Sequence, residues 1–338
     1  MRDAMKIVCV TPAGRRRYLR LLLPHVLACP GLDRYDLWVN TADPGDLAFL
    51  AAVAGLDPRI RLVELAAGPP PGAGRIRHFW PLAMEGDTLY LRFDDDVVWL
   101  SPGFFETLLD CRLARPDAFV VAPLVINNAL GSFVLQTFGK IVASRGLGPD
   151  RFDPTGWHSA SFAEALHRLL LEIVAAGELG RLACGRLPIS ANCFSINCVS
   201  WFGRDMAAVG GRFPESEDEE AAAGCTLALR AGRINLLETA AVAAHFAFFT
   251  QRLALDASDL LAAYAGLAAA RPELEPWRGR VEALYAAVES RFPDHDTGGG
   301  FRPWVQQPRR NSLLRRLTGT SKPTKPPPRL TVARGPAF

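Results

Sequence analysis

The sequence predicts an α/β fold with a mostly parallel central sheet flanked by helices, followed by C-terminal helices and a flexible tail. Three observations lead to this prediction. Residues 5–127 alternate apolar runs with stretches of helical spacing, which is typical of parallel strands joined by helices. The 338 residues are 49% hydrophobic, enough to bury a large core. After residue 295 the chain becomes rich in glycine, proline and basic residues, a composition that does not support a packed core.

Five apolar runs are the predicted strands of the first half. The first is continuous and ends at a proline, and such runs suit strands that are covered on both faces of the sheet. Because helical segments separate the runs, we expect the strands to lie parallel. The runs are MKIVCVTP (5–12), YDLWVNTA (35–42), RIRLVEL (59–65), TLYLRF (88–93) and AFVVAPLVIN (118–127).

Three segments between these runs predict helices. Residues 15–29 have helical spacing, and we expect Pro24 to kink that helix. Residues 43–56 begin with an Asp-Pro pair, which is typical of a helix start. Residues 101–113 predict a helix with Ser101 as its N-cap and a proline just inside. A Pro/Gly-rich loop separates the third and fourth strands.

The second half is less regular. We expect a helix at 161–176, a strand in the run 192–203, a helix at 221–232 and another apolar run at 241–249. Beyond these, residues 256–292 predict two helices split near a proline.

The net charge of +3 conceals an asymmetry between body and tail. From residue 296 onward there are nine Lys/Arg and one acid, whereas the preceding residues hold 29 Lys/Arg and 34 Asp/Glu. A mildly acidic body argues against a nucleic-acid-binding face. For the basic tail, a solvated and disordered extension is the preferred interpretation over weak peripheral contact with anionic lipid.

Cysteine usage and hydropathy predict a cytoplasmic protein. The alternative is a peripheral location at the inner face of the membrane, reached through the basic tail. The seven cysteines are scattered and form no CxxC pair, so reduced thiols fit better than disulfides or a zinc site. No run of about 18 or more uncharged apolar residues occurs. The N-terminus lacks the apolar region and cleavage site of a signal peptide.

The strongest chemical signal is the triplet Asp94–Asp96, directly after the fourth predicted strand. Ligands of open parallel sheets bind beyond the carboxyl ends of the strands. In an extended chain Asp94 and Asp96 would face one side and Asp95 the other. Two carboxylates on one side form an oxygen site for Mg²⁺ or Mn²⁺ between the protein and a diphosphate. The alternative is a set of capping and loop acids ahead of the next helix.

Four segments together resemble the glycosyltransferase-A (GT-A) superfamily of nucleotide-sugar-dependent transferases. They occur in the order expected for that superfamily over residues 5–250, although residues 130–185 match no part of its pattern. The segments are VTPAGRRR (10–17), RFDDDVVWL (92–100), ESEDEEAAAGCTLALRAG (215–232) and VAAHFAFF (242–249).

The resemblance implies a role for each segment. Asp94 and Asp96 would bind the metal with His245, and Asp94 would also contact the donor. The acidic segment would supply the acceptor base, as Asp218 or Glu219, because its acids are more numerous than helix capping requires. Each segment also has a structural interpretation: the histidine could be a core residue, and the acids a solvated helix start.

Four further residues are predicted to contact the donor. By the same resemblance, Thr11 and Arg15 would contact the nucleotide. Arg75 and Arg77, before the fourth strand, could neutralise the diphosphate or lie on a solvated loop.

The implied function is metal-dependent transfer of a sugar from a nucleotide diphosphate donor, with a UDP-sugar favoured, to a hydroxyl group. The acceptor would be a glycan, a lipid-linked molecule or a small molecule. An imidazole ligand suits Mn²⁺ better than Mg²⁺. An inverting enzyme would use the carboxylate of Asp218 or Glu219 as its base, whereas a retaining enzyme would not need a base there. Both stereochemical outcomes remain open.

The same resemblance implies a domain organisation. Residues 1–295 would form a single GT-A-like domain, with a nucleotide-binding half (5–127), an acceptor half (128–250) and a helical extension (256–292). Residues 296–338 would form the tail.

Two other classes compete with this interpretation. A nucleotidyltransferase also uses paired carboxylates and Mg²⁺, but usually carries a Gly-rich, Lys-bearing loop near the first strand, and TPAGRRR has one glycine and no lysine. A non-catalytic relative would bind a nucleotide sugar or a partner protein. The sequence lacks a Walker-type loop and a GxGxxG fingerprint, which excludes common ATPase and dehydrogenase folds.

Overall fold

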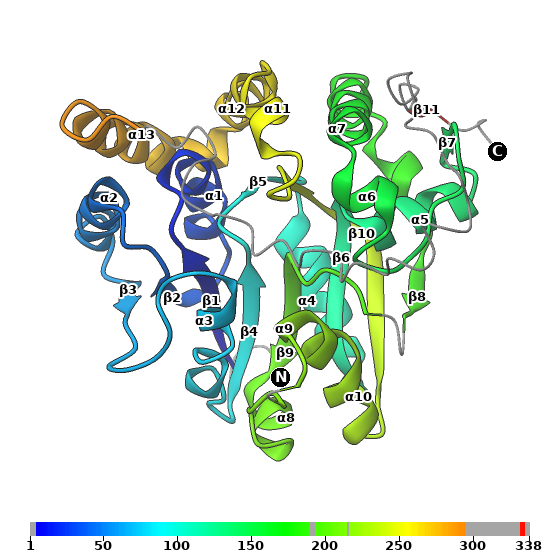
Figure 1. Ribbon diagram of the computed structural model, residues 1–338, viewed down its shortest axis with the longest axis horizontal. Coiled ribbons are helices and arrows are strands. Elements are labelled where there is room, and N and C mark those ends of the chain that lie inside the picture. Colours follow the sequence, from blue (N-terminus) through cyan, green and yellow to red (C-terminus); the bar gives the residue numbers. More distant parts are fainter. Residues whose placement is uncertain (1–4, 190–192, 215, 295–331, 335–338) are drawn as a thin grey trace, which may run out of the picture.

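The computed structural model describes residues 5–189, 193–214, 216–294 and 332–334 (Figure 1). Apart from 332–334, the predicted tail lies outside the described residues. Within the described ranges every helix is too short or too polar to span a bilayer.

The described residues form a nine-stranded sheet with the order β3-β2-β1-β4-β9-β6-β10-β5, and β8 pairs with β10. Strands β3, β2, β1 and β4 are parallel, and β10 is parallel to β6. Strand β9 is antiparallel to both β4 and β6, and β5 and β8 are antiparallel to β10. The predicted α/β fold with a largely parallel sheet is therefore confirmed. The strands of this sheet are β1 (Lys6–Ala13), β2 (Leu32–Val39), β3 (Ile60–Val63), β4 (Thr88–Phe93), β5 (Val97–Leu100), β6 (Ala118–Ile126), β8 (Arg186–Pro188), β9 (Cys198–Phe202) and β10 (Ile234–His245).

A separate two-stranded sheet pairs β7 (Ile141–Ala143) with β11 (Val332–Arg334). The helices are α1 (Arg16–Leu27), α2 (Pro44–Ala54), α3 (Ala73–Ile76), α4 (Phe104–Ala114), α5 (Ala129–Thr137), α6 (Pro154–His158), α7 (Ala160–Ala175), α8 (Gly203–Ala208), α9 (Glu219–Ala221), α10 (Leu227–Arg230), α11 (Arg252–Asp256), α12 (Leu260–Ala269) and α13 (Glu275–Glu289). A single π-helical turn, Ala222–Thr226, joins α9 to α10.

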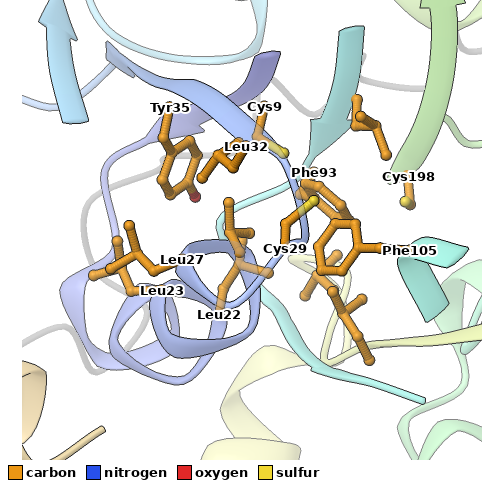
Figure 2. Close-up of a cluster of buried hydrophobic side chains, with 14 of the residues drawn as sticks. Cys9, Leu22, Leu23, Leu27, Cys29, Leu32, Tyr35, Phe93, Phe105 and Cys198 are labelled. Carbon is orange, nitrogen blue, oxygen red and sulfur yellow. The ribbon is translucent and has the colours of Figure 1, made fainter. Parts of the chain in front are cut away.

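Alternate side chains of β1 enter different cores, as expected for a strand covered on both faces. Ile7 and Cys9 join one cluster, and Val8 and Val10 join the other. Figure 2 shows the first cluster, where leucines of α1 face side chains of β1 and β2. The second cluster contains several aromatic side chains, Trp201 among them. Because apolar side chains cover both faces of the sheet, polar functional groups are expected at the ends of the strands.

The C-terminal helices pack against the first helices of the chain. Figure 1 shows α13 beside α1 and α2, and residues of these three helices are in contact. Arg16 of α1 donates through Nε to Glu289 of α13 at 3.3 Å and through Nη1 to Asp46 of α2 at 3.0 Å. The predicted helix pair over 256–292 is confirmed, with its break at Pro272–Leu274.

Three local predictions differ from the structure. Helix α4 begins at Phe104, after Gly103 with φ of 68°, so Ser101 is not its N-cap. Instead the Ser101 hydroxyl accepts the Val242 amide of β10 at 3.2 Å. The strand expected over 192–203 is shorter in the structure, where β9 covers only Cys198–Phe202. The helix expected at 221–232 is interrupted by the π-helical turn.

We expect Trp201→Ala to destabilise the protein by about 3–5 kcal/mol, because it opens a large cavity in the aromatic core. Trp201 is fully buried, stacks on Tyr90 with ring centroids 5.4 Å apart, and donates through Nε1 to the Ala83 carbonyl at 3.1 Å. Urea unfolding measures the loss. Leu229→Ala, at a 57% exposed side chain, is the control and should change stability by less than about 0.5 kcal/mol. Equal stability of the two variants would contradict this packing.

Candidate functional site

The three aspartates lie in a tight turn between β4 and β5. The Val97 amide donates to the Asp94 carbonyl at 3.1 Å, which closes the turn. The extended geometry expected from the sequence is therefore wrong. Asp94 and Asp96 nevertheless converge, and Asp95 points instead toward the β1–α1 turn. The turn places these carboxylates beyond the carboxyl end of β4.

Strand pairing brings His245 to the acids. His245 ends β10 and pairs with Val97 of β5, while the Phe246 amide donates to the Asp96 carbonyl at 2.8 Å. His245 Nε2 consequently lies 3.3 Å from Asp96 Oδ1. The other ring nitrogen, Nδ1, lies 3.2 Å from the Asn127 carbonyl oxygen. A hydrogen bond from Nδ1 to that carbonyl would leave the Nε2 lone pair available to a metal ion.

The residues present fit a divalent cation. Asp94, Asp96 and His245 each offer a ligand atom, and these atoms lie within 4.8 Å of one another. Asp96 Oδ1 is buried and accepts no well-formed hydrogen bond from any of the described residues, which leaves a lone pair for a metal. Two carboxylates with one imidazole are a donor set suited to Mn²⁺ or Mg²⁺.

Two asparagines hold Asp94 in place. Asn197 Nδ2 donates to Asp94 Oδ2 at 2.9 Å, and the Asp94 amide donates to the Asn197 carbonyl at 2.8 Å. Asn128 Nδ2 donates to Asn197 Oδ1 at 2.9 Å, which fixes the amide orientation. Both asparagines are buried, so this carboxylate is held by a rigid network.

Arg15 occupies the opposite side of the acid turn. Its Nε donates to Asp95 Oδ1 at 2.8 Å, and its Nη1 donates to Asp96 Oδ2 at 2.7 Å. The Gly14 amide donates to Asp95 Oδ2 at 2.9 Å. A Cβ on Gly14 would lie 2.9 Å from the Asn40 carbonyl oxygen, so the close approach of this turn favours glycine. Asp95 therefore holds the β1–α1 turn.

Arg92 links the two acidic groups of the site. Its Nη2 lies 2.8 Å from Asp94 Oδ1 and 2.8 Å from Glu219 Oε1. The Glu219 side chain is 10% exposed, whereas Asp218 is 54% exposed. Asp218 accepts the Ala221 amide at 2.8 Å as the N-cap of α9 and is also paired with Arg151.

Burial shifts the protonation of several of these groups. Burial raises the pKa of Glu219 to about 7, against the opposing effect of Arg92 and with an added contribution from Asp94. Burial also raises the pKa of Glu220 to about 7, opposed by Arg151. For Asp96, burial is outweighed by Arg15 and His245, so its pKa is lowered. The pKa of His245 is raised because Asp96 outweighs burial.

The metal-ligand group and the acidic helix start face one cavity of about 450 Å³. Of the residues predicted from the sequence, it is lined by Arg15, Arg77, Asp94, Asp96, Asp218, Glu219 and His245. The structure thus brings together most of the predicted site.

Two predicted nucleotide contacts are not among the residues that line the cavity. Thr11 is fully buried, and its hydroxyl lies 2.9 Å from the Tyr35 hydroxyl. Arg75 donates to the Pro69 carbonyl at 3.3 Å. Arg77 lines the cavity, but its guanidinium donates to the carbonyls of Phe213, Pro214 and Glu217, so it holds the loop before α9.

Sequence reasoning missed Arg92, Asn128 and Arg252. An arginine within the apolar strand TLYLRF was a usable signal, because buried guanidiniums require partners. Arg252 lies seven residues after His245 in an otherwise ordinary helix, and no local pattern marks it. Asn128 caps α5 by accepting the Leu130 and Gly131 amides, so its sequence signal is a helix start.

No protein-family model matches the sequence, and no curated protein has significant similarity to it. Among solved structures, 4-diphosphocytidyl-2C-methyl-D-erythritol synthase from Anaerococcus prevotii DSM 20548 is 13% identical, with a TM-score of 0.40, over 78% of this chain and 97% of that chain. A mycobacterial protein is 16% identical, with a TM-score of 0.43, over 72% and 68%. CMP:2-keto-3-deoxy-manno-octonic acid synthetase complexed with CTP is 14% identical, with a TM-score of 0.36, over 71% and 90%.

Because the pKa of Glu219 is raised in the folded protein, stability should fall as pH rises. The folded protein retains the Glu219 proton up to about pH 7, whereas the unfolded chain loses it near its ordinary pKa of 4.5. Stability from this group is therefore present at low pH and falls as pH rises from about 5 to 7. Glu219→Gln removes this dependence.

We expect the stability of wild type relative to Glu219→Gln to fall by about 3 kcal/mol between pH 5 and pH 8, the free energy of a shift of this size. Urea unfolding at both pH values, in EDTA, measures the difference. A wild-type-minus-variant difference that does not change with pH would mean that Glu219 titrates normally.

Proposed function

We propose that the protein is a divalent-metal-dependent transferase that acts on a nucleotide-activated substrate. One observation carries the proposal. The Asp94–Asp96–His245 group and the acids at the start of α9 face the same 450 Å³ cavity. A metal-ligand group opposite carboxyls with raised pKa is the arrangement needed to stabilise a leaving phosphate and activate an acceptor.

Glycosyl transfer is the first candidate for the reaction, in keeping with the resemblance to the GT-A superfamily. A divalent ion held by Asp94, Asp96 and His245 would supply Lewis-acid stabilisation of the leaving diphosphate. The protein's own groups would orient the donor and accept the proton of the acceptor hydroxyl. A carboxyl with a pKa near 7 is well suited to that second role, because it is a stronger base than an ordinary glutamate.

Among the candidate bases we assign the role to Glu219. Asp218 is largely exposed and engaged as a helix cap and in an ion pair. Glu219 is buried in the cavity wall, and Arg92 joins it to the metal ligand Asp94. Glu220 shares the raised pKa and is the alternative, although its Oε2 lies 3.5 Å from Arg151 Nε.

Nucleotidyl transfer is the second candidate. Paired carboxylates can equally hold a divalent ion on a nucleoside triphosphate, and a turn with Arg15 beside it could accept the phosphates. It is also the chemistry to which the names of two compared structures refer, since one names a diphosphocytidyl product and the other a CMP sugar-acid synthetase with CTP.

The two reactions release different products, which allows one experiment to distinguish them. The protein is incubated with Mn²⁺ and either UDP-, GDP- or CDP-linked sugars with a mixed acceptor panel, or with each nucleoside triphosphate and a sugar phosphate panel. Release of a nucleoside diphosphate supports glycosyl transfer, and release of inorganic diphosphate supports nucleotidyl transfer. The absence of both products, together with no nucleotide-dependent thermal shift, would contradict the proposed function.

We expect Asp96→Asn to abolish the thermal shift that Mn²⁺ with UDP, GDP or CDP produces in the wild type, because an amide is a poor substitute for a carboxylate ligand. Asp117→Asn is the matched control, because Asp117 is exposed and pairs only with Arg115 among the contacts described. Differential scanning fluorimetry measures both. A full shift in Asp96→Asn would remove this residue from the metal site.

We expect Glu219→Gln to lower kcat of glycosyl transfer by about 10²–10⁴-fold, the usual effect of losing a general base. Donor affinity in the presence of Mn²⁺ should stay near the wild-type value. Asp218→Asn should change kcat far less, since its roles are capping and surface pairing. Steady-state kinetics with calorimetry of donor binding measures both quantities, and a larger loss in Asp218→Asn would reverse the assignment.

A further inference from the structure

Arg252 is a cation of the cavity with little compensating charge. It begins α11, lines the cavity, and its side chain is 18% exposed. Its ion-pair partner is Asp96, whose Oδ2 lies 3.8 Å from Arg252 Nη2. Its Nε is buried and has no hydrogen-bond partner among the described residues. A guanidinium in this position retains donors for another ligand.

The same carboxylate oxygen already serves a second arginine. Asp96 Oδ2 accepts from Arg15 Nη1 at 2.7 Å, so two guanidiniums face one oxygen. One carboxylate oxygen cannot satisfy both guanidiniums, so Arg252 retains N–H donors for an anionic ligand.

Arg15 is held rigidly by Asp95. Two of its nitrogens, Nε and Nη2, donate to Asp95 Oδ1, and Asp95 also accepts the Gly14 amide. The guanidinium is therefore fixed by its contacts with Asp95 at the cavity edge. A fixed guanidinium loses little conformational entropy when it binds an anion.

A divalent cation on the Asp94–Asp96–His245 group would leave Arg15 and Arg252 with less compensating negative charge. Asp96 belongs to this group and also faces both guanidiniums, so the cation would share the negative charge that now faces Arg15 and Arg252. A phosphate group that bridges the cation and the two arginines would restore the balance. Guanidinium forks are well matched to phosphate oxygens.

We propose that Arg252, with Arg15, binds the phosphates of the nucleotide, and that metal and nucleotide therefore bind cooperatively. The proposal rests on the proposed function and specifies one part of it: the anionic half of the substrate and the residue that recognises it. It holds for a diphosphate donor and for a triphosphate alike, because both present the same phosphate oxygens.

Isothermal titration calorimetry of the full chain tests the proposal. The protein is titrated with Mn²⁺ alone, then with UDP, GDP or CDP alone, and then with each nucleotide at saturating Mn²⁺. For the wild type we expect nucleotide affinity to rise by about tenfold or more with Mn²⁺, after correction for Mn²⁺–nucleotide association in solution. Arg252→Gln should lower nucleotide affinity in Mn²⁺ by about 10–100-fold, the usual range for a lost charge-assisted hydrogen bond.

The affinity for Mn²⁺ alone separates recognition from a structural effect. In Arg252→Gln it should stay equal or become tighter, because a repelling charge is removed. Arg252→Lys should recover part of the nucleotide affinity. Arg20→Gln is the control, since Arg20 pairs with Glu282 of α13 and should leave all affinities unchanged.

The outcomes distinguish the two proposals. A wild type that binds neither Mn²⁺ nor any nucleotide contradicts the proposed function itself. A wild type that binds both, with Arg252→Gln indistinguishable from it, overturns only the role of Arg252. A variant that loses Mn²⁺ and nucleotide affinity together also overturns this role, because it indicates a structural defect in the site.

Discussion

The pairing of β5 with β10 is the constraint on which the site depends. These strands are far apart in the sequence, and their antiparallel register places His245 opposite Val97. The backbone bond from the Phe246 amide to the Asp96 carbonyl continues that register past the end of β10. Without it, the acid turn and the histidine would have no common position. The geometry of the candidate metal site is thus set by main-chain hydrogen bonds of a buried sheet, which are more rigid than a loop.

Charge burial is the second constraint. Three aspartates at a strand end would repel one another strongly if they were unpaired. Asp95 is compensated by Arg15 and the Gly14 amide, and Asp94 by Arg92 and Asn197. Arg92 also reaches Glu219, so the metal side and the acidic side of the cavity share one guanidinium. This sharing gives the two halves of the proposed reaction a direct electrostatic connection.

The sequence predicted every strand of the first half except β5, together with the main acidic groups, because these depend on local pattern. Continuous apolar runs mark β1, β2, β4 and β6, and an Asp-Pro pair marks the start of α2, where Asp43 caps the helix. The triplet and the acidic helix start were visible as clusters of charge.

The remaining features depend on tertiary structure. The position of Asp96 relative to His245 follows from strand register, which no local pattern encodes. The turn at 94–96 was mistaken for extended chain because the acids directly follow β4 and strand β5 was not predicted. Arg252 acquires its place only when α11 packs at the end of β10. Ser101 resembles a cap in sequence, yet its hydroxyl bonds to β10.

The proposed function requires that Asp94, Asp96 and His245 bind one divalent cation. Pulsed EPR of Mn²⁺ bound to the full chain tests it most directly, because a coordinated imidazole gives a nitrogen modulation that carboxylates and water do not. We predict that modulation in the wild type, its loss in His245→Ala, and its persistence in His158→Ala, a histidine outside the metal-ligand group. Bound Mn²⁺ without the modulation in the wild type, or with the modulation retained in His245→Ala, would show that His245 is not a ligand of the cation.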